Sequence, residues 1–142
     1  MNSSKQTAGM VLDVRIILAV LWVAGMLSSL NGDTYRLSDP VRLQALLANT
    51  GPLVVSSELL LVMSLVFVVP IFMSVLTLTL TCPVSRWANR ILGILYAVIT
   101  LAFWVLGRVV QSAGYEIVWT TAQLVLALLV VWYAWKWANP ES

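Results

Sequence analysis

The chain has 142 residues, of which 61% are hydrophobic and 10% are charged, and its net charge is +2. Soluble domains carry roughly 25% charged residues, so most of this surface must face something other than water. The single cysteine, Cys82, excludes an intrachain disulfide, and the absence of histidine excludes histidine-ligated haem and the common zinc sites. The small net charge argues against nucleic-acid binding. Composition therefore predicts an integral membrane protein, for which we expect no metal site and no cofactor and assign no catalytic residue.

The first long apolar run covers residues 16–30 and follows Asp13. A carboxylate in the first turn of a helix is stabilised by the positive end of the helix dipole. Asn31 and Gly32, which come directly after the run, are typical of a helix end. We therefore expect the first membrane helix over residues 12–31.

A polar stretch, residues 31–51, separates the first apolar run from the second. Within it, Asp39 followed by Pro40 is typical of a helix N-cap and a first helical residue. The apolar residues that come next fall on one side of a helix, and the polar residues fall elsewhere. The stretch predicts a short amphipathic helix over residues 40–48 at the membrane surface, and an ordered loop packed on the end of the bundle is the alternative.

The most apolar part of the chain runs from Leu53 to Leu80 and contains no Lys, Arg, Asp or Asn. A helix needs about 20 apolar residues to cross a bilayer, so this run predicts a spanning helix over residues 53–80. Its two exceptions are Glu58, which would be costly to bury unpaired, and Pro70, which lies too deep to be a cap. We expect Pro70 to form a static kink, and a moving hinge is the alternative.

Two further apolar segments complete the chain and predict helices over residues 84–110 and 116–137. Gly93 and Ala97 form a pair of small residues four positions apart, a spacing that allows another helix to approach closely. The sequence thus predicts an all-α fold. It forms a single transmembrane domain over residues 1–142, in which four helices make an antiparallel bundle.

Basic residues predict the orientation of the helices, because cytoplasmic loops carry an excess of Lys and Arg. Five fall on the side of the amino terminus and three on the other, namely Lys5, Arg15, Arg86, Arg90 and Lys136 against Arg36, Arg42 and Arg108. We therefore expect a multi-pass protein of the cell (inner) membrane with both termini in the cytoplasm. Arg86 and Arg90 are also candidates to bind anionic lipid head groups, although topology alone already explains them.

Three segments together resemble a known family. They are DVR at residues 13–15, RWANRILGILY at residues 86–96 and VVWYAWKW at residues 130–137. With the loop between the first two helices, they resemble a family of small prokaryotic membrane proteins with four helices, classed as a domain of unknown function. The resemblance implies a membrane fold and no activity. Members tend to carry acidic residues before the proline of the second long helix and inside the fourth, where this chain departs from the pattern with Val69 and Gln123.

The candidate binding residues are polar side chains that fall on the outer side once the topology is drawn. We expect Glu58 and Arg108 to pair across the bundle, because a pair would lower the cost of burying each charge. Around them, a polar funnel would bind a small polar or lipid-like molecule. The candidate ligand-binding residues are Glu58, Arg108, Asp33, Arg36, Glu116, Gln123 and Tyr35. The alternative is that these side chains reach the membrane interface and staple the helix ends.

Three classes of function therefore compete. The first is a module that binds or transports a small or lipid-like molecule, and the second is a structural or accessory membrane subunit. The third is a membrane enzyme, for which Ser56, Ser57 and Glu58 are the only nearby nucleophile and base. Small multidrug exporters have a similar size, but they depend on a glutamate in the first helix, which residues 16–30 lack. The expected partners are the lipid bilayer and, because four helices enclose little volume, other copies of the chain.

Overall fold

The computed structural model describes residues 3–50 and 55–137, with side chains from Val14 onward. Five helices make up this part of the chain, namely α1 (Ser3–Ser38), α2 (Pro40–Leu47), α3 (Ser57–Thr79), α4 (Cys82–Val109) and α5 (Gly114–Lys136). All regular secondary structure in the described residues is helical, which confirms the predicted all-α fold.

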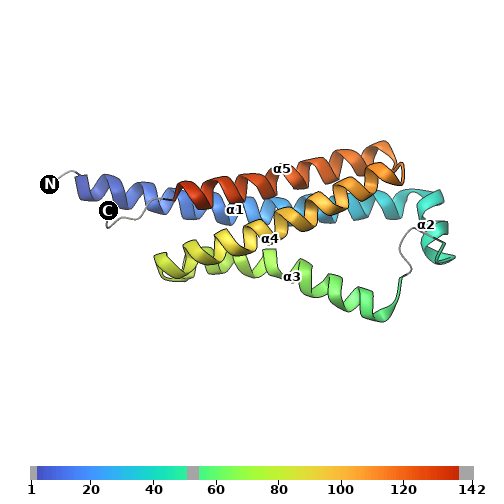
Figure 1. Ribbon diagram of the computed structural model, residues 1–142, viewed down its shortest axis with the longest axis horizontal. Coiled ribbons are helices and arrows are strands. Elements are labelled where there is room, and N and C mark those ends of the chain that lie inside the picture. Colours follow the sequence, from blue (N-terminus) through green and yellow to red (C-terminus); the bar gives the residue numbers. More distant parts are fainter. Residues whose placement is uncertain (1–2, 51–54, 138–142) are drawn as a thin grey trace.

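The helices α1, α4 and α5 lie side by side along the length of the molecule (Figure 1). α5 packs against both α1 and α4, whereas α3 packs mainly against α1. Successive long helices run in opposite directions, so α1 begins and α5 finishes at one end of the bundle, and α2 lies at the other (Figure 1). We call the latter the α2 end. The former is called the basic end, after Arg15, Arg86, Arg90 and Lys136.

Four helices are long and apolar enough to cross a membrane: Val14–Ser38 of α1 and the whole of α3, α4 and α5. Their surfaces carry large apolar side chains that are more than half exposed, among them Val20, Leu61, Val98 and Leu128. Such a surface suits lipid chains, and a helix satisfies its own backbone hydrogen bonds in that medium. These helices indicate a multi-pass membrane protein.

The first helix extends well beyond the predicted end at residue 31, because α1 continues to Ser38. A Cβ atom added to Gly32 would lie 3.3 Å from the Cβ of Trp119, so α5 approaches the backbone of α1 closely at this point. Nearby, the hydroxyl of Ser28 donates to the carbonyl oxygen of Trp119 at 3.3 Å. Packing against α5 therefore keeps this segment helical where the local sequence favours an end.

The short helix α2 begins at Pro40, and Asp39 is its N-cap, as the sequence predicts. The Oδ1 atom of Asp39 accepts hydrogen bonds from the backbone N–H groups of Val41 at 3.0 Å and Arg42 at 3.4 Å. No residue of α2 is buried, so the helix lies on the outside of the bundle. It ends at Leu47, one residue before the predicted boundary.

The buried face of α4 consists mainly of small or polar residues. Its buried residues are Ser85, Asn89, Gly93, Tyr96, Ala97 and Thr100. Asn89 is fully buried, and its Oδ1 accepts a hydrogen bond from the indole Nε1 of Trp22 at 2.8 Å. Its Nδ2 donates to the hydroxyl of Thr77 at 3.0 Å. These bonds join α1, α3 and α4 inside the bundle. The three side chains are buried, so lipid does not reach them.

The helix α3 is held to the bundle through its carboxyl-terminal half. Its buried residues are Pro70, Met73 and Thr77. Arg15 of α1 donates to three carbonyl oxygens at the end of α3, those of Thr77, Leu78 and Leu80. By contrast, no residue from 57 to 69 is buried, and Figure 1 shows this half of α3 diverging from the other long helices. The packing of α3 therefore changes at Pro70.

Candidate functional site

The most closely connected charges lie at the α2 end, around Glu116 in the first turn of α5. The side chain of Glu116 is only 8% exposed. Its Oε1 accepts a hydrogen bond from Nε of Arg36 on α1, and its Oε2 accepts one from Nη2 of Arg42 on α2, both at 3.1 Å. The backbone N–H of Ala113 also donates to Oε2, at 3.1 Å. One carboxylate therefore joins α1, α2 and the turn before α5.

Asp39 makes a second link between α2 and α5, because the hydroxyl of Tyr115 donates to its Oδ2 at 3.0 Å. This hydrogen bond holds the pKa of Asp39 below its usual value of 3.8, and lost hydration acts in the opposite direction. The backbone N–H groups of Arg42 and Val41 and the charge of Arg42 lower the pKa of Asp39 further. Asp39 is therefore ionised at neutral pH, in the form that both caps α2 and accepts from Tyr115.

Two more of the predicted binding residues lie beside these contacts. Asp33 pairs with Arg36 at 3.0 Å, with both side chains partly exposed, and Tyr35 stacks on Trp119 with ring centroids 5.8 Å apart. We call the charged group the Glu116 clasp; it consists of Asp33, Arg36, Asp39, Arg42, Tyr115 and Glu116. Each member contacts another member, so the clasp holds α1, α2 and α5 together.

Glu58 and Arg108 do not form the predicted ion pair. Among the described residues, the ion pairs are those of Arg36 with Asp33 and Glu116, and of Arg42 with Glu116. Glu58 is exposed in the first turn of α3, where the helix dipole stabilises it, and that half of α3 diverges from the bundle. The guanidinium group of Arg108 instead lies 5.2 Å from the ring centre of Trp104, a cation–π contact on its own helix.

Gln123 is half-buried beside Tyr96 of α4 and does not lie in the outer cluster where the sequence led us to expect it. Its Nε2 donates to the hydroxyl of Tyr96 at 2.9 Å. The ring of Tyr96 in turn packs against Trp22, with centroids 5.4 Å apart. Gln123 therefore belongs to the contacts between α1, α4 and α5 and has no link to the Glu116 clasp among the described hydrogen bonds.

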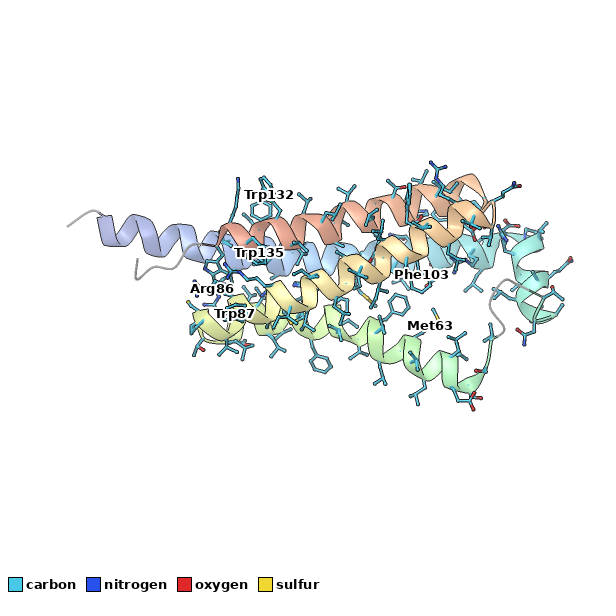
Figure 2. The ribbon with its side chains drawn as sticks, in the orientation of Figure 1. Met63, Arg86, Trp87, Phe103, Trp132 and Trp135 are labelled. Atoms are coloured by element: carbon cyan, nitrogen blue, oxygen red, sulfur yellow. The ribbon has the colours of Figure 1, made fainter. Side chains whose placement is uncertain are left out.

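The helices α3 and α4 contact each other much less than α3 contacts α1. Figure 2 shows Met63 of α3 and Phe103 of α4 pointing into the space between the two helices. Phe103 is 41% exposed and Met63 is half-buried, although α3 and α4 follow each other in the chain. Glu58 and Arg108, in the first turn of α3 and the last turn of α4, lie at the α2 end of the same two helices.

At the basic end, Arg90 is fixed by three contacts. Its Nε donates to the backbone carbonyl of Ala134 at 3.0 Å, and its guanidinium carbon lies 5.6 Å and 4.9 Å from the ring centres of Trp87 and Trp135. Lys136 makes a similar contact with Trp132, at 4.4 Å. Figure 2 shows these tryptophans and Arg86 together at this end. The two predicted head-group residues, Arg86 and Arg90, therefore share one region with an aromatic belt.

Two other features of the described residues offer no specific site. An apolar groove of 390 Å³ lies between α1 and α3 and is lined by residues that include Val20, Val23, Val75 and Leu78. It opens on the apolar surface and presents hardly any polar atom to a ligand. Among the described side chains, no three Cys, Asp or Glu residues come together in a way that could hold a metal ion.

A comparison with known families decides where the chain belongs. The chain matches the family described as "Family of unknown function (DUF6326)" over residues 12–142. The chain belongs to this family. Membership of DUF6326, together with four helices able to cross a membrane, confirms the resemblance found in the sequence. No curated protein and no solved structure matches the chain.

The polar network inside this DUF6326 protein was not predicted from the sequence. A signal was present, because the small or polar residues Ser85, Asn89 and Gly93 lie four positions apart, which marks one face of α4 as the contact face. Sequence analysis also left Arg42 and Tyr115 out of the candidate set. Their roles depend on how α2 folds back on α5, which no local pattern predicts.

Proposed function

We propose that this DUF6326 protein binds an amphipathic, lipid-like molecule from within the membrane, between α4 and the amino-terminal half of α3. The observation that carries the proposal is the contrast within α3. Its carboxyl-terminal half is packed on α1 and capped by Arg15, whereas residues 57–69 contain no buried side chain. A bound molecule at this place would supply the packing that the chain itself does not.

The lining of the proposed site is apolar along the helices. Met63 and Phe103 point into it from opposite sides (Figure 2). A hydrocarbon chain would fit there, but lipid tails are as apolar as these side chains, so apolar contact alone selects no particular ligand. Selectivity would therefore come from shape and from the polar groups at one end.

Those polar groups are Glu58 and Arg108. Both are exposed, and no ion pair joins them, so each is open to a head group. The planar guanidinium of Arg108 suits a phosphate or carboxylate, and the carboxylate of Glu58 suits an amine or a hydroxyl. The proposed ligand is thus a molecule with one or more acyl chains and a polar head group that holds both kinds of partner.

In this proposal the Glu116 clasp supports the site and does not contact the ligand. Glu116 forms ion pairs with both Arg36 and Arg42, and these pairs fix the ends of α1, α2 and α5. Tyr35 and Gln123 have the same supporting role, through Trp119 and Tyr96. Of the seven candidate residues, we therefore assign ligand contact to Glu58 and Arg108 alone.

We further propose that the protein lies in a prokaryotic inner membrane with both termini in the cytoplasm. The excess of Lys and Arg at the basic end supports this orientation. The head group would then lie in the outer leaflet, and a ligand would enter sideways from that leaflet.

A structural or accessory role is the second candidate, and one observation favours it. The clasp leaves its own charges satisfied, as expected of a fold whose polar residues serve stability. In that case a helix of another membrane protein, or of a second copy, would cover residues 57–69 in place of a lipid.

Photocrosslinking with a phospholipid that carries a photoreactive acyl chain tests the proposal. The purified protein would be labelled in detergent micelles and the modified peptides identified by mass spectrometry. We expect labelling to concentrate on residues 57–69 and on the second half of α4. Phe103→Trp and Met63→Trp fill the space and should lower that labelling about fivefold, which corresponds to the loss of about 1 kcal/mol of packing.

The matched control is Leu128→Trp, because Leu128 is 54% exposed on α5, away from α3. Equal labelling of all four long helices, or labelling that Phe103→Trp leaves unchanged, would mean that only bulk lipid is present and would refute the site. If the labelling does concentrate at the site, Glu58→Gln and Arg108→Met, tested singly, identify the charge of the head group. Only Arg108→Met should weaken the binding of an anionic ligand. A disulfide between two copies of Met63→Cys, made in a Cys82→Ser chain, would instead favour self-association at this face.

A further inference from the structure

The described charges of this protein are separated between the two ends of the bundle. All four carboxylates whose side chains are described, Asp33, Asp39, Glu58 and Glu116, lie at the α2 end. The remaining two of the six acidic residues in the chain, Asp13 and Glu141, lie outside the described side chains. At the basic end, the described side chains thus contain cations without a carboxylate.

The cations at the basic end are not equivalent. Arg15 donates to three carbonyl oxygens at the end of α3, so its guanidinium group caps that helix. Arg90 donates a single hydrogen bond, from Nε to Ala134, and no described residue accepts one from its Nη groups. Arg90 is therefore fixed in position while the two Nη groups stay free to donate to a ligand.

Two exposed indole rings flank this arginine. Trp87 and Trp135 are 56% and 57% exposed, and both lie within 5.6 Å of the guanidinium carbon of Arg90. Lys136 lies over Trp132, which is equally exposed, one helical turn before it on α5. Indole rings prefer the level of the lipid head groups, so these contacts hold two cations at that level.

We infer that Arg90 and Lys136, with Trp87, Trp132 and Trp135, bind the phosphate of an anionic phospholipid in the leaflet at the basic end. A phosphodiester accepts two parallel hydrogen bonds from a guanidinium edge, and the ammonium of Lys136 adds a second positive charge at the same end of the bundle. The indole rings would pack against the glycerol and the first carbons of the acyl chains. We call these five residues the Arg90 patch.

Basic residues that only set the orientation of a membrane protein do not have to be held in fixed positions. Orientation depends on the number of such charges near the helix ends. The Arg90 patch differs, since a backbone hydrogen bond and two rings fix Arg90 before any lipid arrives. Preorganisation of this kind lowers the cost of ordering the side chain on binding. The patch is also independent of the proposed function, which uses α3 and α4 at the opposite end.

Native mass spectrometry of the full chain tests the inference, with phosphatidylglycerol and phosphatidylcholine of matched acyl chains as the two probes. We expect the wild-type protein to retain phosphatidylglycerol in preference to phosphatidylcholine. A basic residue that lies against an anionic head group is worth about fivefold in affinity, so Arg90→Gln should lower the preference about fivefold and Arg90→Gln with Lys136→Gln about 25-fold. Soluble glycerol phosphate, added in excess, should not displace the lipid.

The matched control is Lys5→Gln, which removes the same formal charge outside the patch and should leave the preference unchanged. Lys136→Gln alone leaves the Arg90–Ala134 hydrogen bond intact, so it keeps the test valid if Arg90→Gln fails to fold. Three results would overturn the inference: equal retention of both lipids, an equal effect of Lys5→Gln and Lys136→Gln, or displacement by glycerol phosphate. A Phe103→Trp chain should keep the preference, which separates this site from the proposed one.

Discussion

At the scale of single residues, Glu116 illustrates how an apolar helix tolerates a carboxylate close to the membrane. Its position in the first turn of α5 places it at the positive end of the helix dipole. Two arginines from other helices and one backbone N–H then complete its hydrogen bonds. The charge is therefore compensated from three directions, and its removal would leave Arg36 and Arg42 facing each other.

We predict that Glu116→Gln destabilises the protein by about 2 kcal/mol. Breaking a buried ion pair costs about 3–5 kcal/mol, but the two arginine side chains are 41% and 31% exposed, so water screens part of the loss. Unfolding of the purified protein in detergent measures the difference. Asp33→Asn is the matched control, because Asp33 is an exposed partner of the same Arg36, and it should cost less than about 0.5 kcal/mol. An equal loss in both variants would contradict the central role of Glu116.

At the scale of helices, α2 is attached through side chains and not through a buried face, since none of its residues is buried. Asp39 makes one part of this attachment, and the Arg42–Glu116 ion pair makes the other. The carboxylate of Asp39 caps α2 through Val41 and Arg42 and accepts from Tyr115 on α5, and both contacts are stronger with the ionised form. The docking of α2 should therefore follow the protonation of Asp39.

We predict that α2 stays docked at neutral pH and detaches in acid. The pKa of Asp39 is lowered in the folded protein, so its contribution is complete above its usual value of 3.8 and is lost as the pH falls through the lower, folded pKa. Tyr115→Phe removes the largest cause of the shift and should move the transition to higher pH. Hydrogen exchange of residues 40–47 as a function of pH measures it. Tyr35→Phe is the control, and a transition that moves equally in both variants would refute the assignment.

The helices themselves were largely predictable from the sequence, because a run such as Leu53 to Leu80 has few ways to satisfy its backbone outside a membrane helix. The end of α1 was not, since α5 overrides the local signal at Gly32. The Asp39–Pro40 boundary was predictable, because a cap is a local structure.

The candidate site was predictable only in part, for a physical reason. The sequence indicates at which end a charge lies, and it placed Asp33, Arg36 and Glu116 together correctly. It does not indicate which partner each charge meets, because that depends on how helices diverge and rotate. Glu58 and Arg108 illustrate the point: both lie at the expected end, yet the divergence of α3 separates them.

At the scale of the whole molecule, the separation of charge between the two ends has a consequence for topology. The Glu116 clasp holds acidic and basic groups in near balance, whereas the basic end has cations alone among its described side chains. Cytoplasmic ends carry the excess of Lys and Arg, so the basic end should face the cytoplasm. The clasp and the proposed ligand site would then face outward together.

The single cysteine offers a direct test of this orientation. Cys82 is half-buried at the start of α4, at the basic end. A thiol reagent that cannot cross membranes should label it only after the cells are permeabilised. In a Cys82→Ser chain, Ser57→Cys introduces an exposed thiol at the α2 end, which the same reagent should label in intact cells. The reverse labelling pattern would mean that the protein has the opposite orientation in the membrane. The Arg90 patch would then lie in the outer leaflet and the proposed ligand site in the inner one.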